Sequence, residues 1–521
     1  IHGRFASGRY GLNRSAFAGV RRALVRYVQL VGAREDEDFR EVYREYLDSL
    51  AARLERYRSD PSPEAAQPIG AAVGALQTLG QAPALRRALR ARYTRPNLRA
   101  VIREPVVTAG LNNPVDRTAP VRDLILGTTV RGTGRTTGET TASLAASDRH
   151  AVIDLTFLGV NRSNNRGFNR PVTIYSRGTT GVGARTRLYM NATGLHALTT
   201  RANAHTKTNI SAICDRRGRR LVERIAWKRA GRQKCLAEAI AASHAEQRAR
   251  ARIDAEVDDA LTKVNEAFIE KFRRPLARRG LFPRTLAFSS TGEAVHVVWL
   301  QAAAGDIAAA DEPPPPNADV AVGICLHESM VNNMAQMALG GMTVHEELVQ
   351  ADVKRLLGRL PRQLQTPPGD ERWGVRFARR LPVELDLSKG RFTITLRGRK
   401  YYKGDQRHPG MDVSAAYQIA AEDEAFRAVR RGELRIFPPG FDPETDRLST
   451  RQQVIRTLLR KRFSGIFEEE IALGPLEMPG EWSKLGELPP AQFEARGDWL
   501  LLGWKLPAGA VATRARGTPR R

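Results

Sequence analysis

The apolar positions between Arg219 and Phe272, a stretch with no proline and a single glycine, repeat with the period of one long helix. Within two groups they recur in steps of three and four: Leu221, Ile225, Leu236, Ile240, then Ile253, Val257, Leu261, Val264, Phe268 and Phe272. Such a helix would be about 80 Å long. Its single apolar stripe requires a partner along its length. We therefore predict a spine helix against which a sheet packs.

The residues before this helix divide into a helical region and a strand region. Up to about residue 115 the apolar positions follow helical spacing, which predicts a small bundle. From about Pro120 to Cys214 the period changes to two, which predicts about six antiparallel strands with one buried and one solvated face. We expect turns between these strands at Asn164–Gly167, at Thr180-Gly181 and at Gly194.

A second part follows the helix, after the clearest linker in the chain. The segment Ala302–Asn317 contains four consecutive prolines and predicts a stiff, extended spacer. The expected fold class is α+β, with curved antiparallel sheets packed on long amphipathic helices and a helical N-terminal region. We expect a helical region at 1–115, a strand meander with the long helix at 116–301, the linker at 302–317, a second α+β domain at 318–508 and a disordered tail at 509–521.

Composition adds a strong positive charge to this picture. The 521 residues carry a formal net charge of +27, and most of the basic residues are arginine. Alanine and glycine are also abundant, so part of the arginine bias is discounted as the mark of a GC-rich coding sequence. What remains is attraction to polyanions such as nucleic acid, acidic glycans or an anionic membrane face. No stretch approaches eighteen consecutive apolar residues, so no membrane span is predicted.

The densest group of basic residues lies at the start of the predicted spine helix. Nine basic residues are opposed only by Asp215 and Glu223. The nine are Arg216, Arg217, Arg219, Arg220, Arg224, Lys228, Arg229, Arg232 and Lys234. Arginine forks bind phosphates and sulfates in a bidentate manner, so we predict an anion-binding surface here, with a solvated helix end as the alternative. Trp227 is the main aromatic residue in this run, which argues against a base-stacking platform.

A methionine-rich segment in the second part is the predicted ligand-binding wall. A strand at Asp319–Leu326 is followed by a helix whose apolar side carries the candidate residues Met330, Val331, Met334 and Met337. Methionine adapts to varied shapes and suits the wall of a groove for a hydrophobic ligand. The alternative is an ordinary core helix, because such stripes usually serve packing.

No pattern predicts a catalytic residue, a cofactor or a metal site. His327-Glu328 and His345-Glu346-Glu347 flank the short helix but lack the spacing that places two histidines on one helical face. The three cysteines, Cys214, Cys235 and Cys325, have neither the even number of a disulfide framework nor CxxC spacing.

Three segments carry a resemblance to a known family. Val121–Ile210, Val222–Trp227 and His327–Asn333 are similar to a family of large uncharacterised bacterial proteins of envelope or secreted type. This resemblance covers most of the chain and implies no activity. The predicted architecture, with its strand-then-helix unit at 319–339, also resembles the tubular lipid-binding proteins of the bactericidal/permeability-increasing type. That resemblance implies an apolar groove for acyl chains beside a basic rim for anionic head groups.

These expectations lead to three hypotheses of function. The first is a non-enzymatic binding protein of the bacterial cell envelope or secreted space that holds a lipid or another amphiphile with an anionic head group. The second is a structural protein that binds a polyanion, either nucleic acid or an acidic polysaccharide of the envelope. The third is a metal-dependent hydrolase that uses His327 and His345. The chain begins at Ile1 without methionine, so we expect a fragment or a processed product, with any signal peptide outside it.

Overall fold

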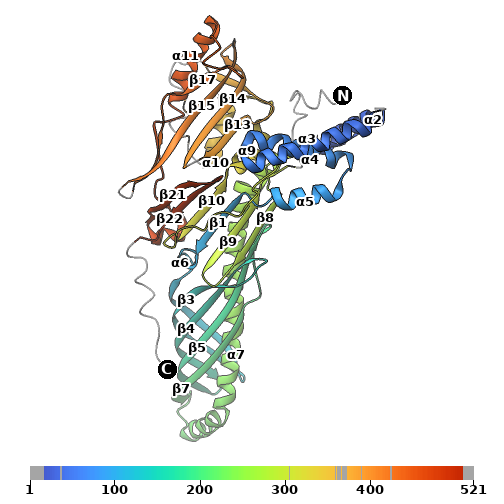
Figure 1. Cartoon of the computed structure of the whole chain (residues 1–521). Helices are drawn as coiled ribbons and strands as arrows, with labels where there is room; N and C mark the ends of the chain where they lie inside the picture. Colours follow the sequence, from blue (N-terminus) through green and yellow to red (C-terminus); the bar gives the residue numbers. More distant parts are fainter. Residues whose placement is uncertain are drawn as a thin grey trace.

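The computed structural model describes residues 17–35, 38–303, 305–357, 360, 365, 372–388, 390–422 and 425–507. It has the predicted α+β class, with curved antiparallel sheets, a long helix and a helical N-terminal region (Figure 1). The molecule is elongated: one sheet and the long helix form one end, a second sheet forms the other end, and a third sheet lies between them. The predicted tail at 509–521 lies outside the described residues.

Four helices form the N-terminal region beside the central sheet. They are α2 (Ala18–Glu35), α3 (Phe39–Ser59), α4 (Pro63–Leu79) and α5 (Pro83–Tyr93). Local sequence determines both ends of α4, because the Ser62 hydroxyl accepts the amide hydrogen of Ala65 and Gly80 ends the helix in the left-handed conformation at φ 72°. Leu50 of α3 packs with Ile69 of α4 in a small apolar core.

The central sheet contains strands from both halves of the chain, in the order β21–β22–β10–β1–β9–β8. The strands are β1 (Leu98–Arg103), β8 (Thr285–Ser290), β9 (Ala294–Leu300), β10 (Val322–His327), β21 (Pro490–Arg496) and β22 (Trp499–Trp504). Strand β1 lies inside the region predicted to be helical, and β9 and β10 pair with its two edges. In the segment predicted as a spacer, Ala308 and Ala309 are buried and Ala309 bridges to Arg95. The two halves are therefore joined by a shared sheet as well as by the chain.

The second sheet and helix α11 enclose a filled apolar core. The elements are β11 (Thr343–His345), β12 (Trp373–Phe377), β13 (Val383–Ser388), β14 (Arg391–Lys403), β15 (Gln406–Glu422), β16 (Ala425–Arg430), β17 (Arg435–Phe437) and β18 (Glu470–Ala472), with helices α9 (Glu328–Leu339), α10 (Glu346–Leu357) and α11 (Thr450–Ser464). Ile455, Leu459 and Phe463 recur every four residues on α11 and are buried against the sheet. Tyr401 and Tyr417 are fully buried on the strands opposite.

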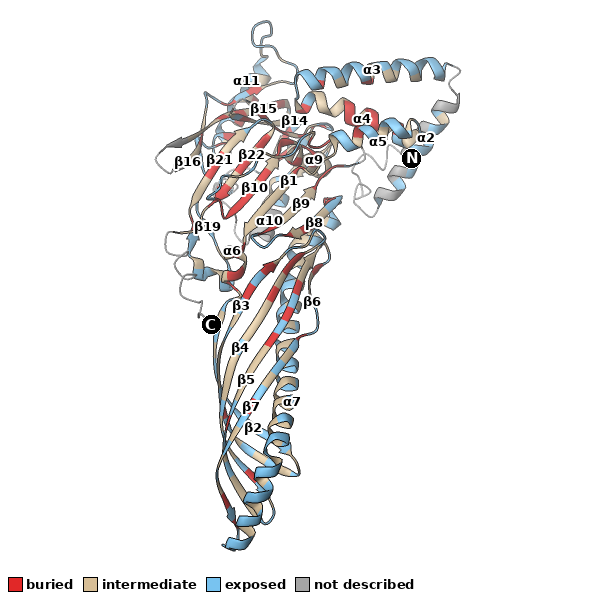
Figure 2. Ribbon diagram, turned by 60° about the horizontal axis from the view of Figure 1, so that its bottom comes forward, coloured by how far each residue is buried: buried red, intermediate tan, exposed pale blue. Residues whose placement is uncertain are grey.

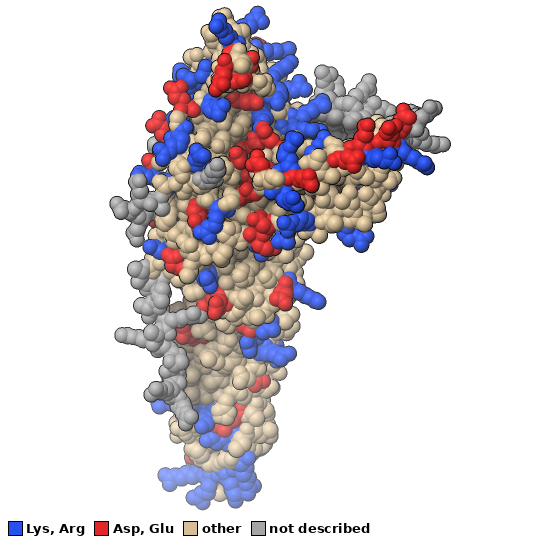
Figure 3. All heavy atoms as spheres, viewed as in Figure 1, with Lys and Arg blue, Asp and Glu red and all other residues tan. Residues whose placement is uncertain are grey.

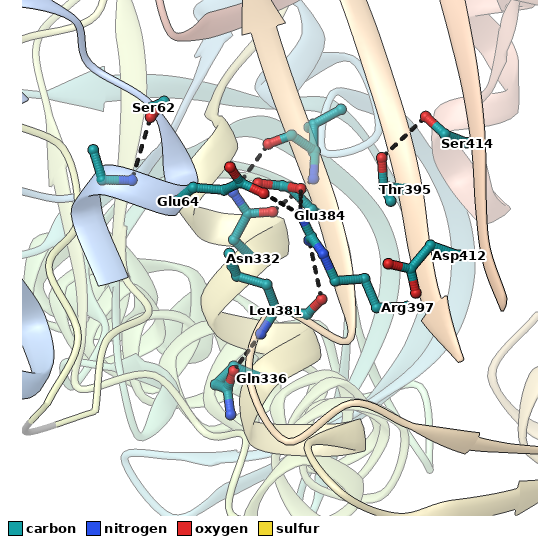
Figure 4. Close-up of polar contacts among 12 residues, drawn as sticks. Ser62, Glu64, Asn332, Gln336, Leu381, Glu384, Thr395, Arg397, Asp412 and Ser414 are labelled. Carbon is teal, nitrogen blue, oxygen red and sulfur yellow. Dashed lines mark hydrogen bonds and ion pairs between the residues drawn. The ribbon is translucent and has the colours of Figure 1, made fainter. Parts of the chain in front are cut away.

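An Arg397 side chain ties the N-terminal helices to this second sheet (Figure 4). Its guanidinium lies 2.6 Å from Glu384 on β13 and 2.5 Å from Glu64 on α4. It also donates to the carbonyl of Leu381. Because Glu384 is buried, its carboxylate requires a partner of this kind, and the arginine supplies it.

Small elements fill the space between the central sheet and the first sheet. They are α6 (Glu104–Ala109), β19 (Leu476–Glu477), β20 (Glu487–Leu488) and the 3₁₀ helix η5 (Gly480–Leu485). The indole of Trp482 in η5 donates to the carbonyl of Val107 in α6. This contact joins residues 375 positions apart in the chain at the base of the first sheet.

The first sheet is a meander of six antiparallel strands, five long and one short, as predicted. They are β2 (Asn113–Ile125), β3 (Thr128–Ala145), β4 (Ala151–Asn169), β5 (Val172–Asn191), β6 (Gly194–Ala197) and β7 (Arg201–Asp215). The expected turns at Asn164–Gly167 and Thr180-Gly181 are wrong, since both lie inside strands. Glycine has another role in these strands. A Cβ atom at Gly138 would come within 2.4 Å of the Leu158 carbonyl oxygen, so glycine permits a close approach of two strands.

The predicted spine helix is present as α7 (Arg220–Ala267), which continues through a π-helical turn, η3 (Phe268–Arg273), into α8 (Arg274–Arg278). Figure 2 shows α7 running beside the first sheet from the central sheet to the free end of the molecule. No residue of α7 is buried. This distinguishes α7 from α11, which presents three buried side chains to its own sheet.

The filled core of the second sheet predicts a large effect of truncation at Leu459. Its side chain is 0 % exposed, so Leu459→Ala is expected to lower the free energy of unfolding by about 2–5 kcal/mol. Val454→Ala on the same helix removes a side chain that is 53 % exposed, and is expected to change it by less than about 0.5 kcal/mol. Chemical denaturation of both variants checks the expectation, and equal effects would contradict it.

A candidate binding cavity between the long helix and the curved sheet

Helix α7 is fixed to one edge of the first sheet by hydrogen bonds to the main chain. Strand β7 and the short β6 pair with β5 on one side only, so their other edge needs partners. Side chains of α7 accept the free amide hydrogens of this edge at 2.6–3.0 Å. The pairs are Glu223 with Asp215, Glu238 with Thr208, Glu246 with Ala204, Asp254 with Thr200, and Asn265 with Leu195.

The spacing of these acceptors matches the spacing of the strand. From Glu238 to Asp254 the carboxylates recur every eight residues, an advance of about 12 Å along a helix. Their partners from Thr208 back to Thr200 recur every four residues, about 13 Å along a strand. The helix therefore follows the strand edge in register, antiparallel to it.

Only side chains join α7 to the other edge of the sheet, strand β2. Asp123 receives hydrogen bonds from His244 at 2.6 Å and from Arg248 at 3.1 Å, and Arg117 lies 3.7 Å from Glu256. Among residues 113–125 and 220–267, all of which the structure describes, no hydrogen bond joins the main chain of β2 to α7. We call this boundary the seam and these ion pairs the seam contacts.

The attachment of α7 to β7 and its attachment to β2 differ in strength. Burial acts to raise the pKa of Asp123, but the hydrogen bonds from His244 and Arg248 outweigh it and hold that pKa below its ordinary value. The exposed Arg117–Glu256 pair contributes only about 0–1 kcal/mol, whereas the Asp123 side chain is 8 % exposed and its contacts contribute more. A backbone group left without its partner costs about 1–3 kcal/mol. Five backbone groups are held at β7, but only two acidic side chains are paired at the seam among the described residues of β2 and α7, so the helix is held more firmly at β7.

A cavity of about 1350 Å³ lies between α7 and the inner face of the first sheet. Seven alanines of α7 line it: Ala226, Ala230, Ala237, Ala241, Ala245, Ala249 and Ala260. Alanine side chains are too short to reach the opposite strands, so the space between helix and sheet stays open. Their spacing of mostly four residues is visible in the sequence, but the predicted stripe took in only large apolar side chains and so missed it.

The lining changes from apolar to polar along the cavity. Toward the central sheet it contains large apolar side chains, namely Leu155, Phe157, Val182, Leu188, Leu195, Ile253, Val257, Leu261 and Val264. Farther along the same strands it contains hydroxyls and amides, namely Asn161, Ser163, Asn165, Ser176, Thr180, Thr206 and Thr208. Two of the predicted anion-binding residues, Arg229 and Lys234, also line the cavity, from the part of α7 nearer its start. Val172, Ile174, Ile210, Val222 and Ile225 are apolar again at the free end.

The remaining residues of the basic run lie outside the cavity. Lysine and arginine side chains gather at the free end of the molecule, where α7 begins (Figure 3). Leu221 and Leu236 were expected to face the sheet, but they are 67 % and 55 % exposed and do not line the cavity. That part of the predicted stripe is wrong, because the alanine face, and not the leucine face, lies toward the strands.

The methionine segment lies in another part of the molecule. None of Met330, Val331, Met334 and Met337 lines the cavity. Met330 is buried, and Val331 packs against the core of the second sheet. The sulfur of Met337 accepts a hydrogen bond from Gln301 at 3.3 Å. These contacts place α9 between the central and second sheets.

The two histidines considered for a metal site lie on different sheets. His327 ends β10 in the central sheet, where burial lowers its pKa to about 4 and its Nδ1 accepts the amide hydrogen of Ser329. His345 belongs to β11 of the second sheet. In the ranges that the structure describes, no three histidine, cysteine or acidic side chains are grouped as a metal site requires.

Comparisons with known proteins give only distant likenesses in structure. No protein-family model matches the chain, and no curated protein matches it in sequence. Among solved structures, a lipopolysaccharide binding protein is similar at 10 % identity and a TM-score of 0.27, covering 79 % of this chain and 99 % of that one. P47 from Clostridium botulinum A2 is similar at 7 % identity and a TM-score of 0.20, covering 79 % and 97 %. TM-scores this low support no inference about function from either likeness.

The main-chain contacts of α7 predict that single carboxylates matter for the sheet edge. Glu238→Ala leaves the Thr208 amide without its acceptor, and is expected to lower the free energy of unfolding by about 1–3 kcal/mol. Glu266→Ala, at an exposed position of the same helix, is the matched control and should have little effect. Hydrogen exchange of the β7 amides locates the change, and unaltered protection near Thr208 would contradict the assignment.

Proposed function

We propose that the protein is a non-enzymatic binding protein for an amphiphile with an anionic group. Its apolar chain would occupy the part of the cavity next to the central sheet, and its anionic group would lie near Arg229 and Lys234. The observation that carries this proposal is the change of the lining from apolar to polar along one continuous cavity. The apolar part and the adjoining polar part together are complementary to a molecule with one apolar and one polar end, and the apolar residues of the free end lie beyond the polar part.

The size of the cavity favours a chain over a compact metabolite. Pockets for drug-sized molecules usually measure about 300–1,000 Å³, and this cavity is larger at about 1350 Å³. Each methylene group transferred from water to an apolar environment contributes about 0.8 kcal/mol. A chain of many methylenes in the part lined by Phe157, Val257 and Leu261 would therefore bind tightly without any specific polar contact.

The polar part has groups suited to a head group. The hydroxyls of Thr180 and Thr206 lie 2.9 Å apart, and the amide of Asn161 donates to Thr136. The Oδ1 atom of Asn165 is buried and has no hydrogen-bond partner. The hydroxyls and amides that line this part of the cavity, and not this buried atom, are the groups available to a head group.

The proposed location is the cell envelope or the secreted space, where amphiphiles with anionic groups are abundant. Within the described ranges, the structure contains no helix with the length and apolar character that a membrane crossing requires. Native mass spectrometry of the protein purified from its own cells tests the proposal. We expect a co-purified lipid or related amphiphile, and consistently empty protein that takes up no added amphiphile would overturn it.

Narrowing the cavity with a large side chain is predicted to weaken uptake. Ala249→Phe adds a ring to a side chain that lines the cavity, whereas Ala255→Phe makes the same change at an exposed position outside it. We expect Ala249→Phe to weaken binding of a fluorescent fatty acid at least about tenfold, or about 1.4 kcal/mol. The control should bind like the wild type. Equal binding by both variants would mean that the fatty acid binds outside this cavity.

Charge removal distinguishes amphiphile binding from polyanion binding. Arg229→Gln with Lys234→Gln should weaken an anionic amphiphile several-fold and leave a neutral one unchanged, because these residues line the cavity. Arg232→Gln, an exposed residue of the same basic run outside the cavity, is the control. An equal loss in the control, together with steep salt dependence and no preference for an amphiphile, would favour the polyanion hypothesis.

A further inference from the structure

The cavity wall is discontinuous at the seam between α7 and β2. Neighbouring strands of the first sheet are joined by continuous hydrogen-bonded ladders. The β7 edge is joined to α7 through main-chain amides from Leu195 to Asp215. The seam alone depends on contacts between side chains, within the residues that the structure describes for these elements.

The seam contacts are themselves part of the cavity wall. Asp123 and Arg117 of β2 line the cavity, and so do Arg248 and Glu256 of α7. Separating these pairs would therefore open the side of the cavity along α7 to solvent. The separated groups are charged side chains, which water solvates well, whereas opening at β7 would leave backbone amides unpaired.

The position of the seam also suits a chain that must reach the apolar part. Glu256 is next to Val257, and Arg117 lies opposite on β2. A chain that came in from the free end of the molecule would have to pass the hydroxyls and amides between Asn161 and Asn165. Passage of methylenes through that polar part is unfavourable because the polar groups would lose their hydration.

We propose that the seam between α7 and β2 is a lateral portal through which an amphiphile chain reaches the apolar part of the cavity. The ion pairs of Asp123 with His244 and Arg248, and of Arg117 with Glu256, hold the portal closed. Helix α7 stays attached to β7 while its contacts with β2 separate. The portal rests on the proposed function for its biological meaning, but its opening can be measured without any ligand.

Thiol labelling measures the opening directly. Val182→Cys places a thiol on the wall of the apolar part, in a chain whose exposed cysteines are removed by Cys214→Ser and Cys235→Ser. Asp123→Ala with Glu256→Ala breaks both seam contacts. We expect N-ethylmaleimide to label position 182 at least about fivefold faster, the change expected for loss of the exposed Arg117–Glu256 pair alone. Glu266→Ala is the control for removal of an acidic residue and should not change the rate.

Ligand kinetics then tests whether the portal admits the chain. With a fluorescent fatty acid, the seam variant should show association and dissociation rates raised by the same factor, with Kd unchanged within about twofold. A change in Kd without a change in the association rate would mean that these residues bind the ligand and do not gate it. Labelling that is no faster in the seam variant than in the control would overturn the portal.

The two proposals fail in different ways. In one outcome, the wild-type protein takes up no amphiphile while breaking the seam still speeds labelling. That result would support the opening at the seam and contradict the proposed function. If Asp123→Ala prevents folding, judged by the loss of a cooperative thermal transition, Arg117→Gln replaces it. Arg117 and Glu256 are both exposed, so this variant should fold and should still increase the labelling rate.

Discussion

The structure depends on one requirement: the free backbone edge of β7 must find hydrogen-bond acceptors. A strand of fifteen residues with one open edge invites pairing with another chain. Helix α7 supplies carboxylate and amide oxygens at the rise that matches the strand, from Glu223 to Asn265. This match fixes the helix in register along the sheet. It also fixes which helical face turns inward, and that face consists mainly of alanine.

The two ends of the molecule illustrate how side-chain volume decides between a core and a cavity. Each combines a helix with a curved antiparallel sheet. Helix α11 contributes the buried side chains of Ile455, Leu459 and Phe463, and its sheet contributes buried tyrosines. Helix α7 presents alanines and has no buried residue. The same arrangement of elements is therefore packed solid at one end and hollow at the other.

Charge is also distributed unequally around α7. Acidic side chains face β7, where they are used as acceptors for the backbone. Mixed ion pairs face β2, and unmatched arginines and lysines gather at the free end (Figure 3). The net charge of +27 thus does not describe a uniformly basic surface. Helix α7 itself carries ten basic and eight acidic residues, so most of the net charge comes from other parts of the chain.

The sequence by itself determined the element types, because periodicity reports local conformation: the long helix, the antiparallel meander and the helical N-terminal region follow from steps of three to four or two. It could not assign β1, since strand pairing with β9 and β10 decides that segment and those partners lie some two hundred residues away. It could not choose between the leucine and alanine faces of α7 either. Size favours burying Leu221 and Leu236, but hydrogen bonds to β7 fix the rotation of the helix and leave both exposed. The cavity is a consequence of that rotation, so only the tertiary structure contains it.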